Sequence, residues 1–297
     1  MTGKIQDKAK AYHRWGLDQA RTAARFVLAG RDHAAPKLDR TDAVTIPLPG
    51  RDLTARLYVP TGATEPGPLM VFFHGGGFVI GDIETHDALC HRLADAAKVR
   101  VLSVDYRLAP EHPFPAQIDD GFDVMGWVFD NAASLGADPR RVAIGGDSAG
   151  AYVAVATVLR LPGQITAQLL LYPLLHLEDD IWAESLLADS RVVGRLAVRY
   201  IRACLAEAAI EVPSLLGSAS ALTPPTIVVT GGVLDPVRPD ALVYVRELQA
   251  IGATCHCRQY GGQAHGFLNL THVSPQACAA ITEFGGLLAT TIAGARP

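Results

Sequence analysis

A serine within the pentapeptide GDSAG, residues 146–150, carries the strongest chemical signal in the sequence. The pentapeptide fits the pattern G-x-S-x-G, in which the serine stands on a sharp turn between a strand and a helix. An apolar run precedes it, and a helical pattern over Ala149–Leu161 follows it. Such a turn exposes the hydroxyl of Ser148 beside a helix N-terminus, where developing negative charge is favoured. The pattern predicts a nucleophilic serine, and a loop whose serine merely caps the helix is the alternative.

The segment HGGG, residues 74–77, is a second candidate for chemistry, and it follows the apolar run Leu69–Phe73. Acyl transfer needs N–H donors at the carbonyl oxygen that becomes an oxyanion, and glycine N–H groups can approach that oxygen without a Cβ in the way. A phosphate-binding loop is the alternative, but the sequence lacks both the lysine-containing P-loop pattern and the dinucleotide-binding pattern. The segment therefore predicts an oxyanion hole.

An acid and a histidine follow the serine in the chain order Ser, Asp, His that this kind of site uses. Asp235 comes just after the apolar run Thr226–Val229, and His265 stands among small residues further on. Sites in open α/β sheets lie at the carboxyl ends of the strands, where both residues are expected. The alternatives are a solvated turn aspartate and an ordinary loop histidine. Nearby Asp240 is interpreted as first-turn charge of the helix Pro239–Ala250.

A metal site is a weaker candidate. Cys255 and Cys257 flank His256, which places both sulfurs on one face of an expected strand. Structural zinc needs four ligands, usually with a second pair at short spacing, and the sequence offers no such pair. We expect two small apolar side chains packed in a core and no metal site.

The elements that must position these residues follow an alternating pattern. Near-continuous apolar runs separated by helices indicate a parallel sheet that is covered on both faces. A helix over residues 8–30 and an antiparallel strand pair from Thr41 come first. The expected strands are then Leu69–Phe73, Val101–Val104, Val142–Ile144, Gln168–Leu171, Thr226–Val229 and Cys255–Tyr260, and the expected helices are His86–Ala97, Ala116–Asn131, Ala149–Leu161 and Pro239–Ala250.

One stretch, His176–Pro213, breaks this rhythm and is interpreted as a helical insertion above the sheet. Together with the N-terminal helix it would roof a water-poor acyl pocket, with Trp182, Leu186 and Leu187 in contact with the substrate. Because the roof is short, we expect acyl groups of up to roughly eight carbons. The alternative is that these three residues only pack the insertion onto the core. The expected division is 1–40 and 176–213 as the cap, with 41–175 and 214–297 as the catalytic core.

Composition limits the partners. The chain has 297 residues, 26 basic and 30 acidic, for a formal charge of −4, so it lacks the basic footprint of a nucleic-acid-binding protein. Its most apolar stretches, near Ala151–Leu161 and Ile165–Leu175, are too short to span a bilayer. Five scattered cysteines fit a reducing cytoplasm better than a disulfide framework. We expect a cytoplasmic protein with a small-molecule substrate, and leave a homodimer open.

Several longer motifs together resemble the bacterial hormone-sensitive-lipase-like family of α/β-hydrolases, which are carboxylesterases. They are HGGGFVIGDIETHD at 74–87, DYRLAPEHPFPA at 105–116, GGDSAG at 145–150, an Asp-Pro step at 235 and HGF at 265–267. The resemblance covers nearly the whole chain from Thr41. It implies an α/β fold, with a twisted, mainly parallel eight-stranded sheet and helices on both faces under a small helical cap. It also implies hydrolysis of carboxylic esters without a cofactor.

The resemblance also implies roles for individual residues. Ser148 is the nucleophile, His265 the base and Asp235 the carboxylate that orients it, so the reaction passes through an acyl-enzyme. The family's oxyanion donors fall on the N–H groups of three residues, which are Gly75, Gly76 and Ala149.

This sequence departs from the family pattern in places that bear on the substrate. Ala151-Tyr152 follows the GDSAG motif where the family usually has Gly-Asn, and DPVRP at 235–239 replaces the family's DPLRD. A lactonase, a thioesterase or an amide deacylase of a biosynthetic pathway therefore stays open, since one triad serves all three. A non-catalytic ligand-binding protein of the same fold is a further alternative, which the complete triad disfavours.

Overall fold

The computed structural model describes residues 16–29, 32, 34–177, 201–205 and 212–294. Trp182, Leu186 and Leu187, on which the expected acyl pocket depends, lie outside these residues, as does most of the insertion 176–213.

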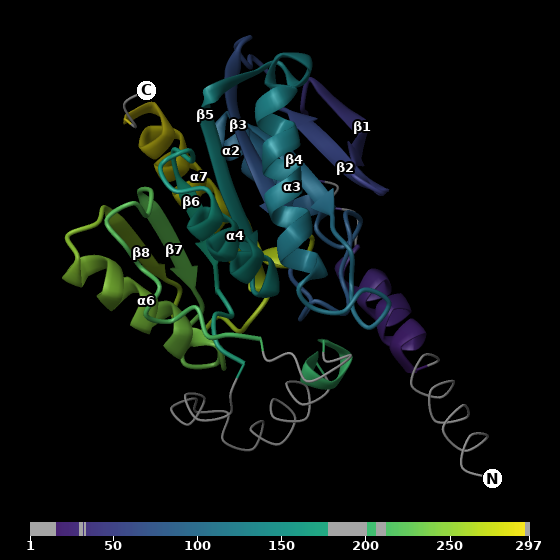
Figure 1. The fold of residues 1–297 in the computed structure, drawn as a ribbon, viewed down its shortest axis with the longest axis vertical. Coiled ribbons are helices and arrows are strands. Elements are labelled where there is room, and N and C mark those ends of the chain that lie inside the picture. The colour runs from purple at the N-terminus through teal and green to yellow at the C-terminus, as the bar shows by residue number, and fades with distance from the viewer. Residues whose placement is uncertain (1–15, 30–31, 33, 178–200, 206–211, 295–297) are drawn as a thin grey trace.

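A single eight-stranded sheet in the order β1-β2-β4-β3-β5-β6-β7-β8 organises the described chain (Figure 1). β2 pairs antiparallel with β1 and with β4, and every other neighbouring pair is parallel. The expected mainly parallel sheet is confirmed. The strands are β1 (Arg40–Leu48), β2 (Arg51–Val59), β3 (Gly67–Phe73), β4 (Arg100–Asp105), β5 (Ala137–Asp147), β6 (Gln168–Leu171), β7 (Thr226–Thr230) and β8 (Cys255–Gln259).

Helices cover both faces of the sheet and bury a separate apolar core on each (Figure 1). Helices α3 (Ala116–Asp130), α4 (Ala149–Arg160) and α6 (Arg238–Ala250) contribute to the core on one face, while α2 (Asp87–Ala97) and α7 (Pro275–Gly294) contribute to the other. The central strands are apolar on both faces because both faces are covered. This architecture brings the carboxyl ends of β3, β5, β6, β7 and β8 to one edge, where the loops that follow them meet.

Helix α7 is the long element that the sequence analysis missed. Its sequence contains the pair Gly285-Gly286, which lowers helix propensity. Gly285 nevertheless suits a tight contact, since a Cβ there would lie 2.6 Å from the Cβ of Ala96 on α2. By length and composition alone α7 could cross a membrane, but 39% of its apolar window is buried inside the structure. One such helix is weak evidence for a membrane span, because core helices pass the same test.

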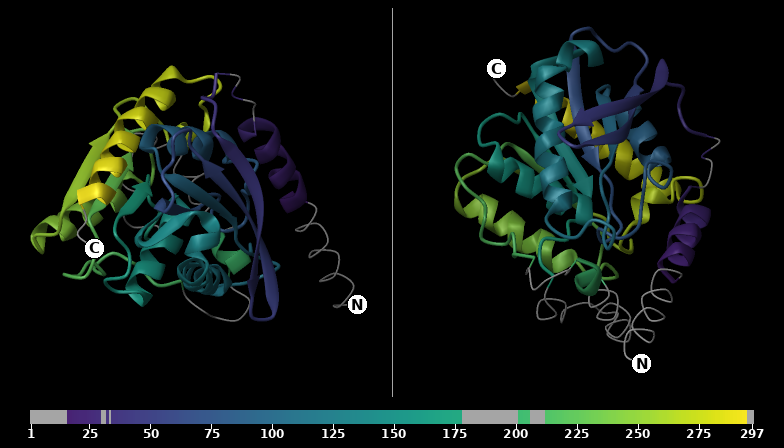
Figure 2. Two further views of the ribbon diagram at one scale, coloured as in Figure 1. Left: turned by 90° about the horizontal axis from the view of Figure 1, so that it is seen from above. Right: turned by 45° about the vertical axis from the view of Figure 1, so that its right-hand side comes forward.

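The N-terminal helix, described over residues 16–28, lies outside the helices that cover the sheet and close to the loops of the site (Figure 2). Arg21 holds it there, donating to the carbonyl oxygens of Val79 and Ala109 and pairing with Glu111 at 2.8 Å. Arg25 adds an ion pair with Asp82. Leu17 of the same helix is buried and belongs to one of the two apolar cores.

Candidate active site

The turn between β5 and α4 places Ser148 at the carboxyl edge of the sheet. β5 ends at Asp147 and α4 begins at Ala149, so Ser148 alone makes the turn, with φ +52° and ψ −117°. A non-glycine residue seldom adopts a positive φ, and such strain is typical of functional sites. The flanking glycines permit the turn, because a Cβ at Gly150 would lie 1.9 Å from the carbonyl oxygen of Phe73. The expected strand–turn–helix context is therefore present.

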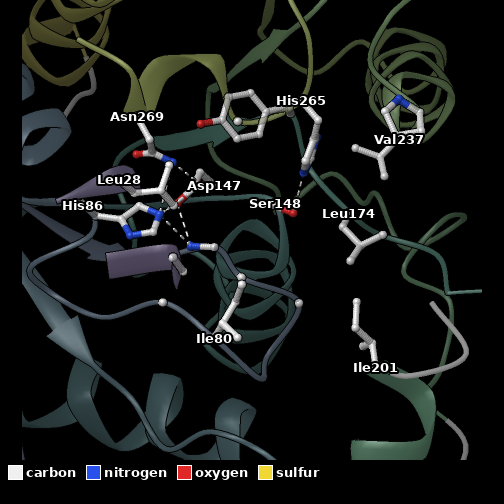
Figure 3. Close-up of a pocket in the computed structure, with 18 residues that line it drawn as sticks. Leu28, Ile80, His86, Asp147, Ser148, Leu174, Ile201, Val237, His265 and Asn269 are labelled. Atoms are coloured by element: carbon white, nitrogen blue, oxygen red, sulfur yellow. Dashed lines mark hydrogen bonds and ion pairs between the residues drawn. The ribbon is translucent and has the colours of Figure 1, made fainter. Parts of the chain in front are cut away.

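The three residues of the expected triad meet at this turn, and Figure 3 shows two of them, Ser148 and His265. The Oγ atom of Ser148 lies 2.9 Å from Nε2 of His265, and Nδ1 of His265 lies 3.0 Å from Oδ1 of Asp235. With Nδ1 protonated, the imidazole donates to the carboxylate and Nε2 accepts from the hydroxyl. Val237 N–H donates to the same carboxylate oxygen at 3.1 Å. The Tyr172 ring meets the imidazole of His265 edge-on, with 5.0 Å between the ring centroids.

The surroundings of His265 change its proton affinity. Burial lowers the pKa of the imidazole, whereas the adjacent Asp235 carboxylate raises it by charge and by hydrogen bonding, and the net result is a pKa above the ordinary value. Asp235 itself is buried, at 1% exposed. The carboxylate of Asp235 therefore stabilises the protonated form of the imidazole.

The oxyanion expectation needs one correction, at Gly75. Its N–H donates to Oδ1 of Asp147 at 2.7 Å and so is already used inside the protein. In the described chain no acceptor is found for the N–H groups of Gly76, Gly77 or Ala149. Gly76 and Gly77 have φ of +119° and +62°, which favour glycine. The N–H groups available to an oxyanion are therefore those of Gly76, Gly77 and Ala149, with Gly77 in place of the expected Gly75.

Peptide planarity fixes where these free donors point, because C=O and N–H of a trans peptide face opposite ways. The carbonyl of Gly75 lies 2.8 Å from Nδ1 of His74, and the carbonyl of Gly76 accepts from the N–H groups of Val79 and Ile80. Both carbonyls are therefore held away from the cavity that Gly76 and Gly77 line, which leaves the following N–H groups facing it.

A cavity of about 310 Å³ opens over Ser148 and His265 (Figure 3). Its apolar wall consists of Ala24, Leu28, Ile80, Leu174, Ile201, Pro236 and Val237. Ala24 and Leu28 belong to the N-terminal helix, which was expected to roof the pocket. The other wall residues follow the carboxyl ends of strands or begin a described helical turn at 201–205, and no spacing rule in the sequence marks them.

The structure also shows the surroundings of the two cysteines of β8 and of Asp240, for which there were expectations from the sequence. Cys255 and Cys257 are half-buried on β8 and pack against the apolar core, as their interpretation as packed side chains requires. Asp240 stands in the first turn of α6 as expected, but it is fully buried rather than a surface charge. Its Oδ2 accepts from the N–H groups of Leu175 and His176, at 2.7 and 2.9 Å.

The sequence analysis also missed a second buried aspartate–histidine pair beside the first. Asp147 directly precedes Ser148, and its Oδ1 lies 3.1 Å from Nε2 of His86, at the start of α2. Asn269, four residues after His265, approaches the same carboxylate at 3.4 Å. His86 was interpreted only as a helix residue, and nothing in its local pattern indicates a contact with Asp147 61 residues away.

Comparison with known proteins agrees with this geometry. The sequence model of a family described as having the alpha/beta hydrolase fold matches residues 70–269. A carboxylic ester hydrolase of Mycobacterium tuberculosis, LipN, is 37% identical over 83% of this chain and 69% of its own. An arylesterase of Saccharolobus solfataricus is 33% identical over 82% of each chain.

Solved structures of esterases share this fold. The esterase of Pyrobaculum calidifontis superimposes with a TM-score of 0.82 at 29% identity, over 94% of this chain and 92% of its own. Given the fold, the Ser148–His265–Asp235 contacts and these matches, the chain belongs to the hormone-sensitive-lipase-like carboxylesterases of the α/β-hydrolase fold.

Proposed function

We propose that Ser148, His265 and Asp235 cleave carboxylic esters through an acyl-enzyme. His265 takes the hydroxyl proton while Ser148 attacks the ester carbonyl, and Asp235 holds the imidazole in the required tautomer. The tetrahedral intermediate collapses as His265 protonates the leaving alkoxide. A water molecule, activated by the same imidazole, then releases the acid. The observation that carries this proposal is the unbroken contact chain from Ser148 to Asp235, at 2.9 and 3.0 Å.

The N–H groups of Gly76, Gly77 and Ala149 would stabilise the oxyanion. Among the described residues none accepts these three N–H groups, and Ala149 adds the N-terminus of α4, where negative charge is favoured. Gly75 is left out because Asp147 already accepts its N–H. Such donors stabilise the transition state more than the substrate, since they lie where charge develops.

The substrates we propose are neutral esters with short to medium acyl chains. The wall of the cavity is apolar, and its volume of about 310 Å³ is at the small end for ligand pockets. Among the relatives, one from Pseudomonas putida is named ethyl acetate hydrolase, which agrees with a small substrate. The cap assignment of residues 1–40 and 176–213 stays part of this proposal, supported by Ala24, Leu28 and Ile201 in the wall.

A chain-length series tests the pocket. We expect kcat/KM for p-nitrophenyl esters to be highest for short acyl groups and to fall steeply beyond roughly eight carbons. Leu28→Ala removes part of the wall, so the ratio of octanoate to butyrate activity should rise. Phe26→Ala is the matched control on the same helix, because Phe26 is 88% exposed and lies outside the wall. A preference for palmitate, or an equal shift in both variants, would contradict the proposed pocket.

The same panel separates the rival reactions. A lactone, a thioester and an anilide of one acyl group all require the triad, so only relative kcat/KM can rank them. A non-catalytic binding protein is disfavoured by the direct contact between Ser148 and the imidazole. It would be supported if none of these acyl donors were turned over by the folded protein.

A further inference from the structure

The carboxylate of Asp147 is buried beside the loop that carries Gly75, Gly76 and Gly77. It contacts groups from three parts of the chain (Figure 3). Its side chain is 3% exposed. Gly75 N–H donates to it from the loop at 2.7 Å, and His86 Nε2 approaches it from the start of α2 at 3.1 Å. Asn269 donates to it at 3.4 Å from the segment that follows His265. None of these contacts belongs to the Ser–His–Asp chain.

His86 is itself held in place to face this carboxylate. Its Nδ1 lies 2.9 Å from Oγ1 of Thr85 and 3.3 Å from the carbonyl oxygen of Asp82. Burial lowers the pKa of His86, but the Asp147 carboxylate raises it, for a net increase. Burial raises the pKa of Asp147, but His86 lowers it, for a net decrease. The contacts with His86 and with the Gly75 N–H satisfy a carboxylate that would otherwise be costly to bury.

The peptide group between His74 and Gly75 is hydrogen-bonded at both its carbonyl and its N–H. Tyr106 Oη donates to the carbonyl of His74 at 2.8 Å, and Asp147 accepts the N–H of Gly75. The fit is close, since a Cβ on Gly75 would lie 2.5 Å from Oδ2 of Asp147. This peptide is the first of the loop, and the free N–H groups of Gly76 and Gly77 follow directly. Its orientation therefore sets the starting direction for both donors.

We infer that Asp147, held in place by His86, is a positioning residue that aims the Gly76 and Gly77 N–H groups at the developing oxyanion. This inference rests on the proposed function of those donors. Asp147 touches neither the nucleophile's hydroxyl nor the imidazole in any hydrogen bond of the described chain, so it acts through the loop. Its loss should reduce transition-state binding far more than substrate binding.

The main experiment replaces Asp147. Asp147→Ala should lower kcat for p-nitrophenyl butyrate on the order of 10²–10³-fold, the cost of losing an oxyanion donor, with KM changed by less than about threefold. Asp147→Asn keeps an oxygen for the Gly75 N–H and should recover most of the lost kcat. A trifluoromethyl ketone, whose adduct with Ser148 carries the oxyanion, should bind Asp147→Ala more weakly by a similar factor.

A matched control separates positioning from stability. Asp120 is also fully buried and paired with arginines, Arg51 at 2.7 Å and Arg107 at 2.8 Å, but it does not line the cavity. Asp120→Ala should lower the melting temperature and leave kcat per folded molecule unchanged. The inference is overturned if Asp147→Ala keeps the wild-type kcat per folded molecule, if it loses activity only through KM, or if Asp120→Ala shows the same loss.

A second pair of variants covers the case in which Asp147→Ala does not fold. His86→Gln keeps an N–H donor that can reach Asp147 and should retain most of the activity, whereas His86→Leu should follow the expectation for Asp147→Ala. Equal activity in the two His86 variants would overturn the inference. Failure of the proposed function is distinguishable, because Ser148→Ala would then stay active, whereas an inactive Ser148→Ala with a fully active Asp147→Ala refutes the positioning role alone.

Discussion

Two buried carboxylates each face a histidine at this site, and what lies on the far side of each ring gives them different roles. Beyond His265, which Asp235 orients, lies the hydroxyl of Ser148. Beyond His86, which faces Asp147, the hydrogen-bonding groups of the described residues are the Thr85 hydroxyl and the carbonyl of Asp82. These surroundings support the proposed proton transfer by the first pair and the inferred positioning role of the second.

Substitution can identify the carboxylate that orients His265. Asp235→Asn should lower kcat by a factor on the order of 10⁴, because the amide favours the wrong imidazole tautomer. Asp240→Asn, one turn along, should cost little activity, since Asp240 contacts backbone N–H groups and not His265. Steady-state kinetics of both variants on p-nitrophenyl butyrate checks this. A larger loss in Asp240→Asn would mean that the orienting carboxylate has been misassigned.

The second residue-scale prediction concerns pH. His265 must be neutral to accept the proton, and its pKa in the folded protein is raised above 6.5 by the carboxylates of Asp235, Asp147 and Asp240, against burial. The imidazolium therefore persists to higher pH, and kcat/KM should rise with pH through a midpoint above 6.5. The midpoint should fall in Asp235→Asn, measured on its residual activity. A midpoint that is below 6.5 in the wild type, or that does not move, would argue against His265 as the base.

At the scale of elements, α6 is tied to the chain that leaves β6. Asp240 accepts two N–H bonds from this segment, and the neighbouring Leu174 lines the cavity. The helix therefore supports the wall of the pocket as well as one face of the sheet. The first-turn position of Asp240 is readable from the sequence, whereas its burial depends on a segment 64 residues earlier.

The burial of Asp240 predicts an unusual pH dependence of stability. Burial raises the pKa of Asp240 to about 7, from 3.8. An acid with a raised pKa binds its proton more tightly in the folded state, so the free energy of unfolding should fall as pH rises from about 4 to about 7 through this group. Asp240→Asn keeps an acceptor oxygen without the charge and should flatten that fall. Urea unfolding at several pH values checks it; parallel curves for both proteins would contradict the assignment.

At the scale of the whole molecule, the sequence predicts what depends on local pattern. The glycines around Ser148 and the apolar runs of β3, β6 and β7 are local signals, and the sheet and triad followed from them. Helix α7 was not predicted because its glycine pair weakens the local helix signal. The close packing of Gly285 against Ala96 offsets this low helix propensity, and it depends on a distant part of the chain. The Gly75 assignment failed for a similar reason, since the acceptor of its N–H lies 72 residues away.

In the proposed reaction one hydroxyl, that of Ser148, forms the covalent intermediate. The most direct measurement is stoichiometric labelling with a p-nitrophenyl phosphonate ester, followed by peptide mass mapping and an activity assay on the same samples. We expect one phosphonyl group per chain, on the peptide that contains Ser148, with activity lost in proportion to labelling and no labelling of Ser148→Ala. A label on another residue, or undiminished activity once Ser148 is fully modified, would contradict it.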